Sequence, residues 1–314
     1  PESVRPQRKE FPNTRGGHRQ LVKFLQRFKR PVRVGCEATG TYGLDVALGL
    51  HAAEGIEIAV LNPRRVKDFA RARGHVQKSD PRDADLLREF VANMDFRPWQ
   101  PPSSTALELR QITRRIMTLT AQRTAETNRR HAARATGTLA PVIEDSVRTV
   151  IEHLGEQIRL LEQTARQLVR QDPALERRYG LLTSVTGIGP RSALLLLGEL
   201  AVLSDGFSAR QWVSLAALFP RVERSGTSVY RRRGIGPAGN KYLRQALFMP
   251  ALTAVRHCPP LREFHQRLVD RGFTPLQAVV AVMRRLLHII HALFKTNAAF
   301  DVTRVGTRKI APAA

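Results

Sequence analysis

Apolar residues recur along residues 147–168 at alternating spacings of four and three. Such a heptad stripe places one apolar seam on a helix and is typical of a coiled coil. A shorter run with the same spacing occupies residues 109–119, and a turn at residues 137–141 separates the two runs. We therefore predict two long antiparallel helices, whose seam closes either within one chain or between two chains. The longer seam consists of Val147, Ile151, Leu154, Ile158, Leu161, Ala165 and Leu168.

The residues before this hairpin alternate between strand and helix signals. Residues 32–36 alternate like a strand that ends at Glu37, and residues 56–61 read as a second, buried strand. Asn62-Pro63 is typical of a helix start, and another helix begins at Asp80-Pro81. This order predicts an α/β domain with parallel strands, whereas helical patterns dominate from Tyr179 to about residue 300.

The chain is strongly basic, with 51 Lys and Arg against 27 Asp and Glu among its 314 residues and a formal net charge of +24. A polyanion offsets such a charge, and nucleic acid is the first candidate. An acidic membrane surface ranks lower because the basic residues are spread along the whole chain. No apolar run approaches a membrane span, and two cysteines, Cys36 and Cys258, fit a reducing cytoplasm.

Three carboxylates form the first candidate site. Glu37 ends the first predicted strand, and Asp80 and Asp83 lie three residues apart at a helix start, where they share one face. Gathered carboxylates repel one another unless a cation lies between them, and Mg²⁺ prefers such oxygen ligands together with phosphate. The alternative is that Asp80 only caps its helix and Asp83 occupies the favoured first turn.

Ser225 forms the second candidate site because it precedes a glycine within a run of basic residues. A hydroxyl is a weak nucleophile without activation, whereas arginines can grip a phosphate and stabilise the transition state. Alone, Ser-Gly reads as a turn in a DNA-contacting loop, and Ser228 is a poorer candidate nucleophile. The basic residues that we expect to contact nucleic acid are Arg224, Arg231, Arg232, Arg233, Lys241 and Arg244.

Gly187-Ile188-Gly189 resembles the turn of a helix-hairpin-helix motif. Glycines there would let backbone amides approach a phosphate at a helix start. A structural turn between two apolar helices explains the same residues equally well, so both interpretations stay open.

Longer blocks of the sequence resemble the DEDD transposases of the IS one-ten insertion-sequence family, relatives of the pilin-gene invertase. The likeness rests on Glu37-Ala-Thr-Gly-Thr-Tyr42, Lys78-Ser-Asp-Pro-Arg-Asp-Ala84 and the segment from Asn62 to Ala70. In the second half it rests on Thr186-Gly-Ile-Gly-Pro190, on a Leu-x-Pro segment before Ser225-Gly226, and on Gly239 to Arg244. Ala217 departs from the pattern because the family usually has Gly there.

The resemblance implies a RuvC-like, RNase H-type domain at residues 1–100, a helical hairpin or coiled coil at 101–175, and a mostly helical transposase domain at 176–314. Glu37, Asp80 and Asp83 would be three of four Mg²⁺ ligands, and Ser225 would be the nucleophile. The family's first Asp, on a strand before Phe11, has no counterpart among residues 1–10. Either that strand is absent from this sequence, or the metal site is incomplete.

The expected function is therefore that of a DNA transposase or site-specific recombinase. By resemblance its partners are donor DNA, target DNA and a structured bridge RNA that guides it, and it assembles as a homodimer or homotetramer. We expect a bacterial cytoplasmic, nucleoid-associated protein without a membrane partner. Two alternatives are a RuvC-like nuclease that uses metal-activated water and a non-catalytic nucleic-acid-binding protein.

Overall fold

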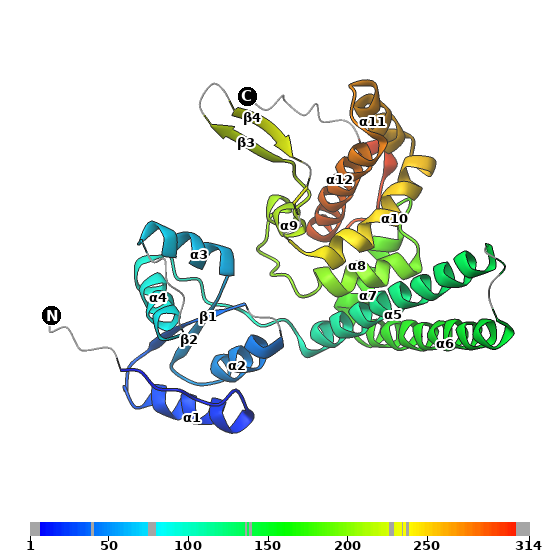
Figure 1. The fold of residues 1–314 in the computed structure, drawn as a ribbon. Helices are drawn as coiled ribbons and strands as arrows, with labels where there is room; N and C mark the ends of the chain where they lie inside the picture. The colour runs from blue at the N-terminus through cyan, green and yellow to red at the C-terminus, as the bar shows by residue number, and fades with distance from the viewer. Residues whose placement is uncertain are drawn as a thin grey trace. The chain divides into compact units, whose positions relative to one another are not determined.

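A computed structural model describes residues 7–38, 41–74, 80–135, 137, 140–225, 229–233, 235–236 and 239–305. The side chains of residues 41–42, 80–81, 221–225 and 229–233 are outside this description. The chain divides into two compact units, Pro1–Pro101 and Pro102–Ala314, which are drawn in Figure 1 and described here one at a time.

The first unit is built around two parallel strands, β1 (Val32–Glu37) and β2 (Ile56–Leu61), joined through α2 (Thr41–His51). Their register pairs Val32 with Ile56 and Glu37 with Leu61. Both predicted strands and their parallel direction are confirmed. The RuvC-like fold remains a prediction, because the described residues of this unit form only two strands.

Helices cover both faces of this small sheet. α1 (Arg15–Gln26) and α2 contribute Leu21, Ala47 and Leu50 to one cluster with Ile56 and Ile58. α3 (Pro63–Ala72) and α4 (Asp80–Asn93) form a second cluster with Leu61. α3 begins as predicted, since the Asn62 side chain accepts a 2.9 Å hydrogen bond from the Arg64 backbone N–H. The second cluster consists of Val66, Leu86 and Phe90, with Leu61, Phe69, Ala70 and Leu87 around it.

The second unit begins with the predicted hairpin, formed by α5 (Ser104–Ala135) and α6 (Pro141–Gln171). Ile116, Leu119 and Ile158 are buried between the helices, and Leu154 and Leu161 pack against them. Leu109 and Ala165 belong to the main core of the unit. The heptad seam therefore closes within one chain over this stretch, which decides a choice that the sequence left open.

The main core gathers the helices that follow the hairpin. These are α7 (Pro173–Thr183), α8 (Pro190–Leu200), α9 (Ala209–Ala216), α10 (Lys241–His257), α11 (Pro259–Asp270) and α12 (Pro275–Thr296). A short 3₁₀ helix, η1 (Val302–Arg304), follows them. Between α9 and α10 lies an antiparallel ribbon of β3 (Arg221–Ser225) and β4 (Val229–Arg233), visible in Figure 1.

α12 corrects the expectation that no apolar run approaches membrane-spanning length. It has 22 residues and a mean hydropathy of 1.4 in its most apolar window, enough to cross a membrane by length and composition. Arg284 and Arg285 lie within it, and its apolar side chains pack in the core, where Val282, Leu286 and Ile290 are fully buried. The high hydropathy of α12 is therefore explained by its packing as a core helix.

The turn between α7 and α8 places the two candidate glycines in different surroundings. Gly187 has φ +101°, and a Cβ there would lie 2.8 Å from both the Ala254 nitrogen and the Pro250 oxygen of α10. Gly189 caps α8, and a Cβ there would meet no atom within 4 Å. Packing against α10 therefore explains Gly187, and both glycines border a pocket of about 540 Å³ that is also lined by Ser192, so their contact with a phosphate stays a prediction.

We predict that Gly187→Ala lowers the free energy of unfolding by at least about 2 kcal/mol, because it adds left-handed strain and a backbone clash. Gly189→Ala is the matched control and costs about 1 kcal/mol or less. Urea denaturation followed by circular dichroism measures both values. Equal effects of the two substitutions would contradict the packing role of Gly187.

Candidate functional site

Glu37 lies at the end of β1, on the face of the sheet that α4 covers. Side chains alternate along a strand, so Glu37 shares a face with Gly35. A Cβ at Gly35 would lie 2.5 Å from the Val91 side chain of α4, which shows how closely this helix approaches the strand. Glu37 is half-buried, and its side chain has no hydrogen bond or ion pair with the described residues.

Asp83 lies in the first turn of α4. It precedes Leu87 and Phe90 by four and seven residues, and positions with this spacing share one helix face. Phe90 and Leu87 pack in the cluster that includes Leu61, the register partner of Glu37. Asp83, like Glu37, has no polar partner among the described residues. Glu37 and Asp83 thus belong to facing surfaces of packed elements.

Asp80 is the first residue of α4, and its side chain is outside the description. Within the described ranges, no three His, Cys, Asp or Glu side chains gather as a metal site. The two described acids still match the chemistry of a magnesium site, because Mg²⁺ commonly takes only one or two protein carboxylates beside substrate phosphates. The donor set of Glu37 and Asp83 therefore fits a magnesium ion.

Ser225 is the last residue of β3, and its backbone pairs with Val229 of β4. The next pairs along the ribbon are Arg224 with Tyr230 and Glu223 with Arg231. Arg232 and Arg233 pair with Val222 and Arg221. The backbone thus places Arg224, Arg231, Arg232 and Arg233 on the same ribbon as Ser225, while residues 226–228 are outside the description.

A set of backbone contacts closes the base of this ribbon. The Asn240 backbone N–H donates to the Leu215 carbonyl at 2.7 Å. Gly239 has φ +92°, and a Cβ there would lie 2.7 Å from the Ala217 Cβ. Arg244 donates from Nη1 to the Ala216 carbonyl at 3.0 Å, which gives it a structural role. We call these contacts the ribbon clasp; the predicted contacts of Arg244 and the exposed Lys241 with nucleic acid stay predictions.

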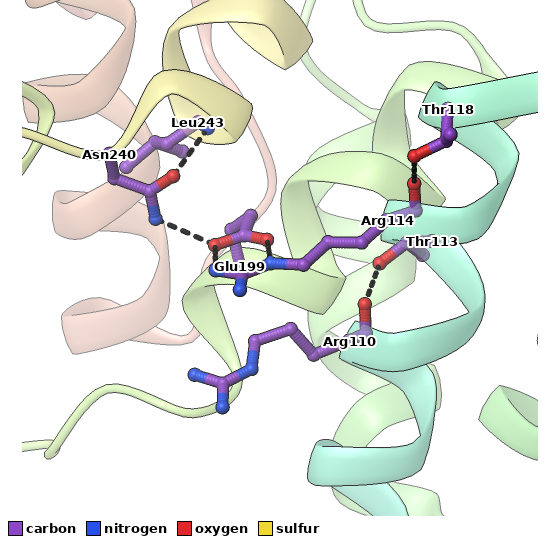
Figure 2. A network of polar contacts seen from close by, with 7 residues as sticks. All are labelled: Arg110, Thr113, Arg114, Thr118, Glu199, Asn240 and Leu243. Atoms are coloured by element: carbon purple, nitrogen blue, oxygen red, sulfur yellow. Dashed lines mark hydrogen bonds and ion pairs between the residues drawn. The ribbon is translucent and has the colours of Figure 1, made fainter. Parts of the chain in front are cut away.

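Glu199 connects the ribbon clasp to the long hairpin (Figure 2). Its carboxylate is 1% exposed and accepts from Arg114 Nε at 2.6 Å and Nη2 at 2.9 Å. Asn240 Nδ2 donates to the same carboxylate at 2.6 Å, while Asn240 Oδ1 accepts from the Leu243 N–H and caps α10. One buried anion thus joins α5, α8 and the start of α10.

The approach of α5 to α8 depends on the residue before Glu199. A Cβ at Gly198 would lie 2.2 Å from the buried Thr113 Oγ1 of α5, so only glycine permits this spacing. The hydrogen bond with Glu199 raises the pKa of Arg114, whose guanidinium also lies over the Tyr242 ring at 4.5 Å. Arg114 is thereby fixed on both sides, by a carboxylate and by an aromatic face.

Comparison with known proteins identifies the family. Residues 2–133 match a family described as a transposase, and residues 179–266 match the Transposase IS116/IS110/IS902 family. The chain is 30% identical over 298 residues to the Pilin gene-inverting protein of Moraxella bovis, across 93% of this chain and 89% of that protein. The Moraxella lacunata protein of the same name is 30% identical over 301 residues, with the same shares.

The chain belongs to the IS110 transposase family. A further relative is the Insertion element IS110 uncharacterized 43.6 kDa protein of Streptomyces coelicolor, 29% identical over 169 residues, 53% of this chain and 40% of that protein. Family membership confirms the predicted transposase or recombinase activity. Glu37 and Asp83 lie in the first matched segment, and Ser225 lies in the second.

Sequence reasoning missed two residues that pack the elements carrying the candidate site, Glu199 and Gly35. Glu199 occurs in the apolar run of α8, and a lone acid there signals a buried, paired charge. Gly35 lies within a strand, where glycine often marks a close approach of another element. Arg114 is one of several arginines on the long hairpin helix, and nothing in the sequence singles it out as the partner of Glu199.

We predict that Glu199→Gln lowers the free energy of unfolding by roughly 2–3 kcal/mol, since it leaves Arg114 without its anion. Arg114 is 37% exposed, so solvent screening keeps the loss below that of a fully buried pair. Glu162→Gln, which affects the more exposed pair with Arg191, changes stability by about 1 kcal/mol or less. Urea denaturation at neutral pH compares them, and a larger loss for Glu162→Gln would contradict the account.

Proposed function

We propose that this transposase cuts and rejoins DNA through attack of the Ser225 hydroxyl on a backbone phosphate. A bond forms between Ser225 Oγ and phosphorus while one phosphorus–oxygen ester bond to deoxyribose breaks. The proton of the serine hydroxyl goes overall to the leaving deoxyribose oxygen. A hydroxyl of another strand then attacks the phosphoserine and releases Ser225. One ester replaces another at each step, so no external energy source is needed.

The observation that carries this proposal is the position of Ser225 on a basic ribbon within a chain of the transposase family. Its backbone lies one register pair from Arg224 and two from Arg231. Arginines at such positions can bind a phosphate through two parallel N–H donors and stabilise the charge that develops on it. The ribbon clasp and Glu199 fix the point at which this ribbon joins the helical core.

Glu37, Asp83 and Asp80 would hold Mg²⁺ in this proposal. When bound, a magnesium ion supplies charge that stabilises phosphate oxygens during cleavage. The support is that Glu37 and Asp83 lie on facing surfaces of β1 and α4 without a cationic partner in the described part of the chain.

The finer expectations of domain and partner follow from family membership. We propose residues 1–100 as a RuvC-like domain, 101–175 as the hairpin and 176–314 as the transposase domain. Donor and target DNA are the substrates, a structured bridge RNA is the guide, and the assembly is a dimer or tetramer in the bacterial cytoplasm near the nucleoid. The formal charge of +24 supports the nucleic-acid partners.

A second candidate function is a nuclease that cuts by metal-activated water. The observation that favours it is that Glu37 and Asp83 lie in one compact unit whereas Ser225 lies in the other. In that case Ser225 would contact DNA without attacking it. Loss or retention of a covalent protein–DNA adduct separates the two functions.

We predict that Ser225→Ala lowers strand exchange by at least about a thousandfold, because removal of a nucleophile leaves only binding contributions. The assay uses the full chain purified without removal of any bound RNA, and it scores recombined DNA and covalent adduct together. Ser228→Ala is the matched control and retains both products. Cleavage by Ser225→Ala at the wild-type rate without an adduct would favour the nuclease.

We predict that EDTA abolishes strand exchange and that added Mg²⁺ restores it. Glu37→Gln and Asp83→Asn each lower the rate by at least about a hundredfold, the upper end of what outer-shell changes cost at metal sites. Asp45→Asn, an exposed acid on α2, retains activity. Full exchange by the Glu37 and Asp83 variants would show that these acids bind no essential metal.

A further inference from the structure

The hairpin helix α5 carries an arginine beside Glu199 that has no described partner. Arg110 precedes Arg114 by four residues, so the two side chains project from the same face of α5. In Figure 2 the Arg110 side chain extends to the same side as Arg114 and ends without a marked contact. None of the described residues forms a hydrogen bond or ion pair with its guanidinium.

The charge around Arg110 is unbalanced. Glu199 is already bound by Arg114 and Asn240, and Lys241 adds a further positive charge beside Tyr242. Burial lowers the pKa of Arg110, and the positive charge of Arg114 lowers it further, while Glu199 partly opposes this. A guanidinium nevertheless stays protonated in proteins. A half-buried cation without a partner is costly, and a bound anion would relieve that cost.

The position of Arg110 indicates which anion fits. Glu199 joins Arg114, four residues along α5, to Asn240 at the base of the ribbon that carries Ser225. Arg114 cannot turn toward a ligand without giving up its carboxylate and aromatic contacts. Arg110 keeps the planar set of donors that matches the oxygens of a phosphate. The guanidinium of Arg110 thus offers a planar set of N–H donors beside the ribbon clasp, at the base of the ribbon that is proposed to cut DNA.

We infer that Arg110 binds a backbone phosphate of the DNA substrate next to the base of the Ser225 ribbon. Glu199 and Tyr242 act as positioning residues, because they hold Arg114 and leave Arg110 as the phosphate ligand. The choice of DNA rests on the proposed function, whereas the phosphate chemistry rests on the described contacts alone. Phosphates of RNA offer the same oxygens, so the experiment separates the two nucleic acids.

The test measures equilibrium binding of the full chain, carrying Ser225→Ala to prevent cleavage, to a DNA duplex and an RNA duplex of unrelated sequence at several salt concentrations. Each phosphate contact on a DNA duplex contributes about 0.9 to the slope of log affinity against log salt. We expect Arg110→Gln to lower that slope on DNA by about 0.9 without lowering the melting temperature, because the substitution removes a half-buried charge that has no partner in the free protein. Arg110→Lys keeps the slope but binds several-fold more weakly, because lysine retains the charge without the planar fork.

Arg115→Gln is the matched control because it removes an equal, exposed charge from α5 at roughly 140° around the helix. Three results would overturn the inference. The slope of log affinity against log salt could stay unchanged in Arg110→Gln, it could fall equally in Arg115→Gln, or it could fall for the RNA duplex alone. Binding does not require the serine, so cutting by Ser225→Ala would reject the serine mechanism and leave this result intact. An unchanged slope together with loss of strand exchange in Ser225→Ala would reject the phosphate site alone.

Discussion

The buried carboxylate of Glu199 connects the elements on which the second unit depends. Burial of a charge is costly unless every oxygen is paired, and here Arg114 and Asn240 pair both. The same Asn240 begins α10 and closes the clasp at the base of the Ser225 ribbon. The interactions of Glu199 therefore fix the point at which the ribbon joins the core, and they hold the Arg114 guanidinium in one orientation. Because the buried pair is favourable only with all its partners in place, it favours a single arrangement of α5, α8 and α10.

The first unit uses a close approach of α4 to β1, the two elements that carry Asp83 and Glu37. Gly35 removes a side chain from β1, so α4 packs closely on the strand. Glu37 then shares the covered face of the sheet, and Asp83 shares the covering face of the helix. Both acids are left without the cations that pair many other carboxylates of this basic chain. The positive net charge is consistent with the DNA substrates of a transposase, and the metal role of the two acids stays part of the proposal.

Much of the fold could be predicted from periodicity, because strands and helices expose their faces at different spacings. The strands ending at Glu37 and Leu61, the cap at Asn62 and the heptad seam were predicted and are present. The supporting residues could not be predicted, because Glu199 pairs with residues 85 and 41 positions away and spacing carries no such information. Ala217 shows another limit: it has φ +51°, a left-handed conformation that favours glycine, and the sequence alone does not show this backbone conformation.

The central claim is that the hydroxyl of Ser225 becomes covalently linked to DNA. Stopping the reaction with denaturant, digesting it with trypsin and nuclease, and sequencing the nucleotide-bearing peptide by mass spectrometry tests this directly. Trypsin releases the peptide from Ser225 to Arg231, which also contains Ser228, so fragment ions must assign the modified residue. The account predicts a phosphodiester-linked nucleotide on Ser225. A nucleotide on Ser228 or on another residue, or cut DNA without any linked peptide, would contradict it.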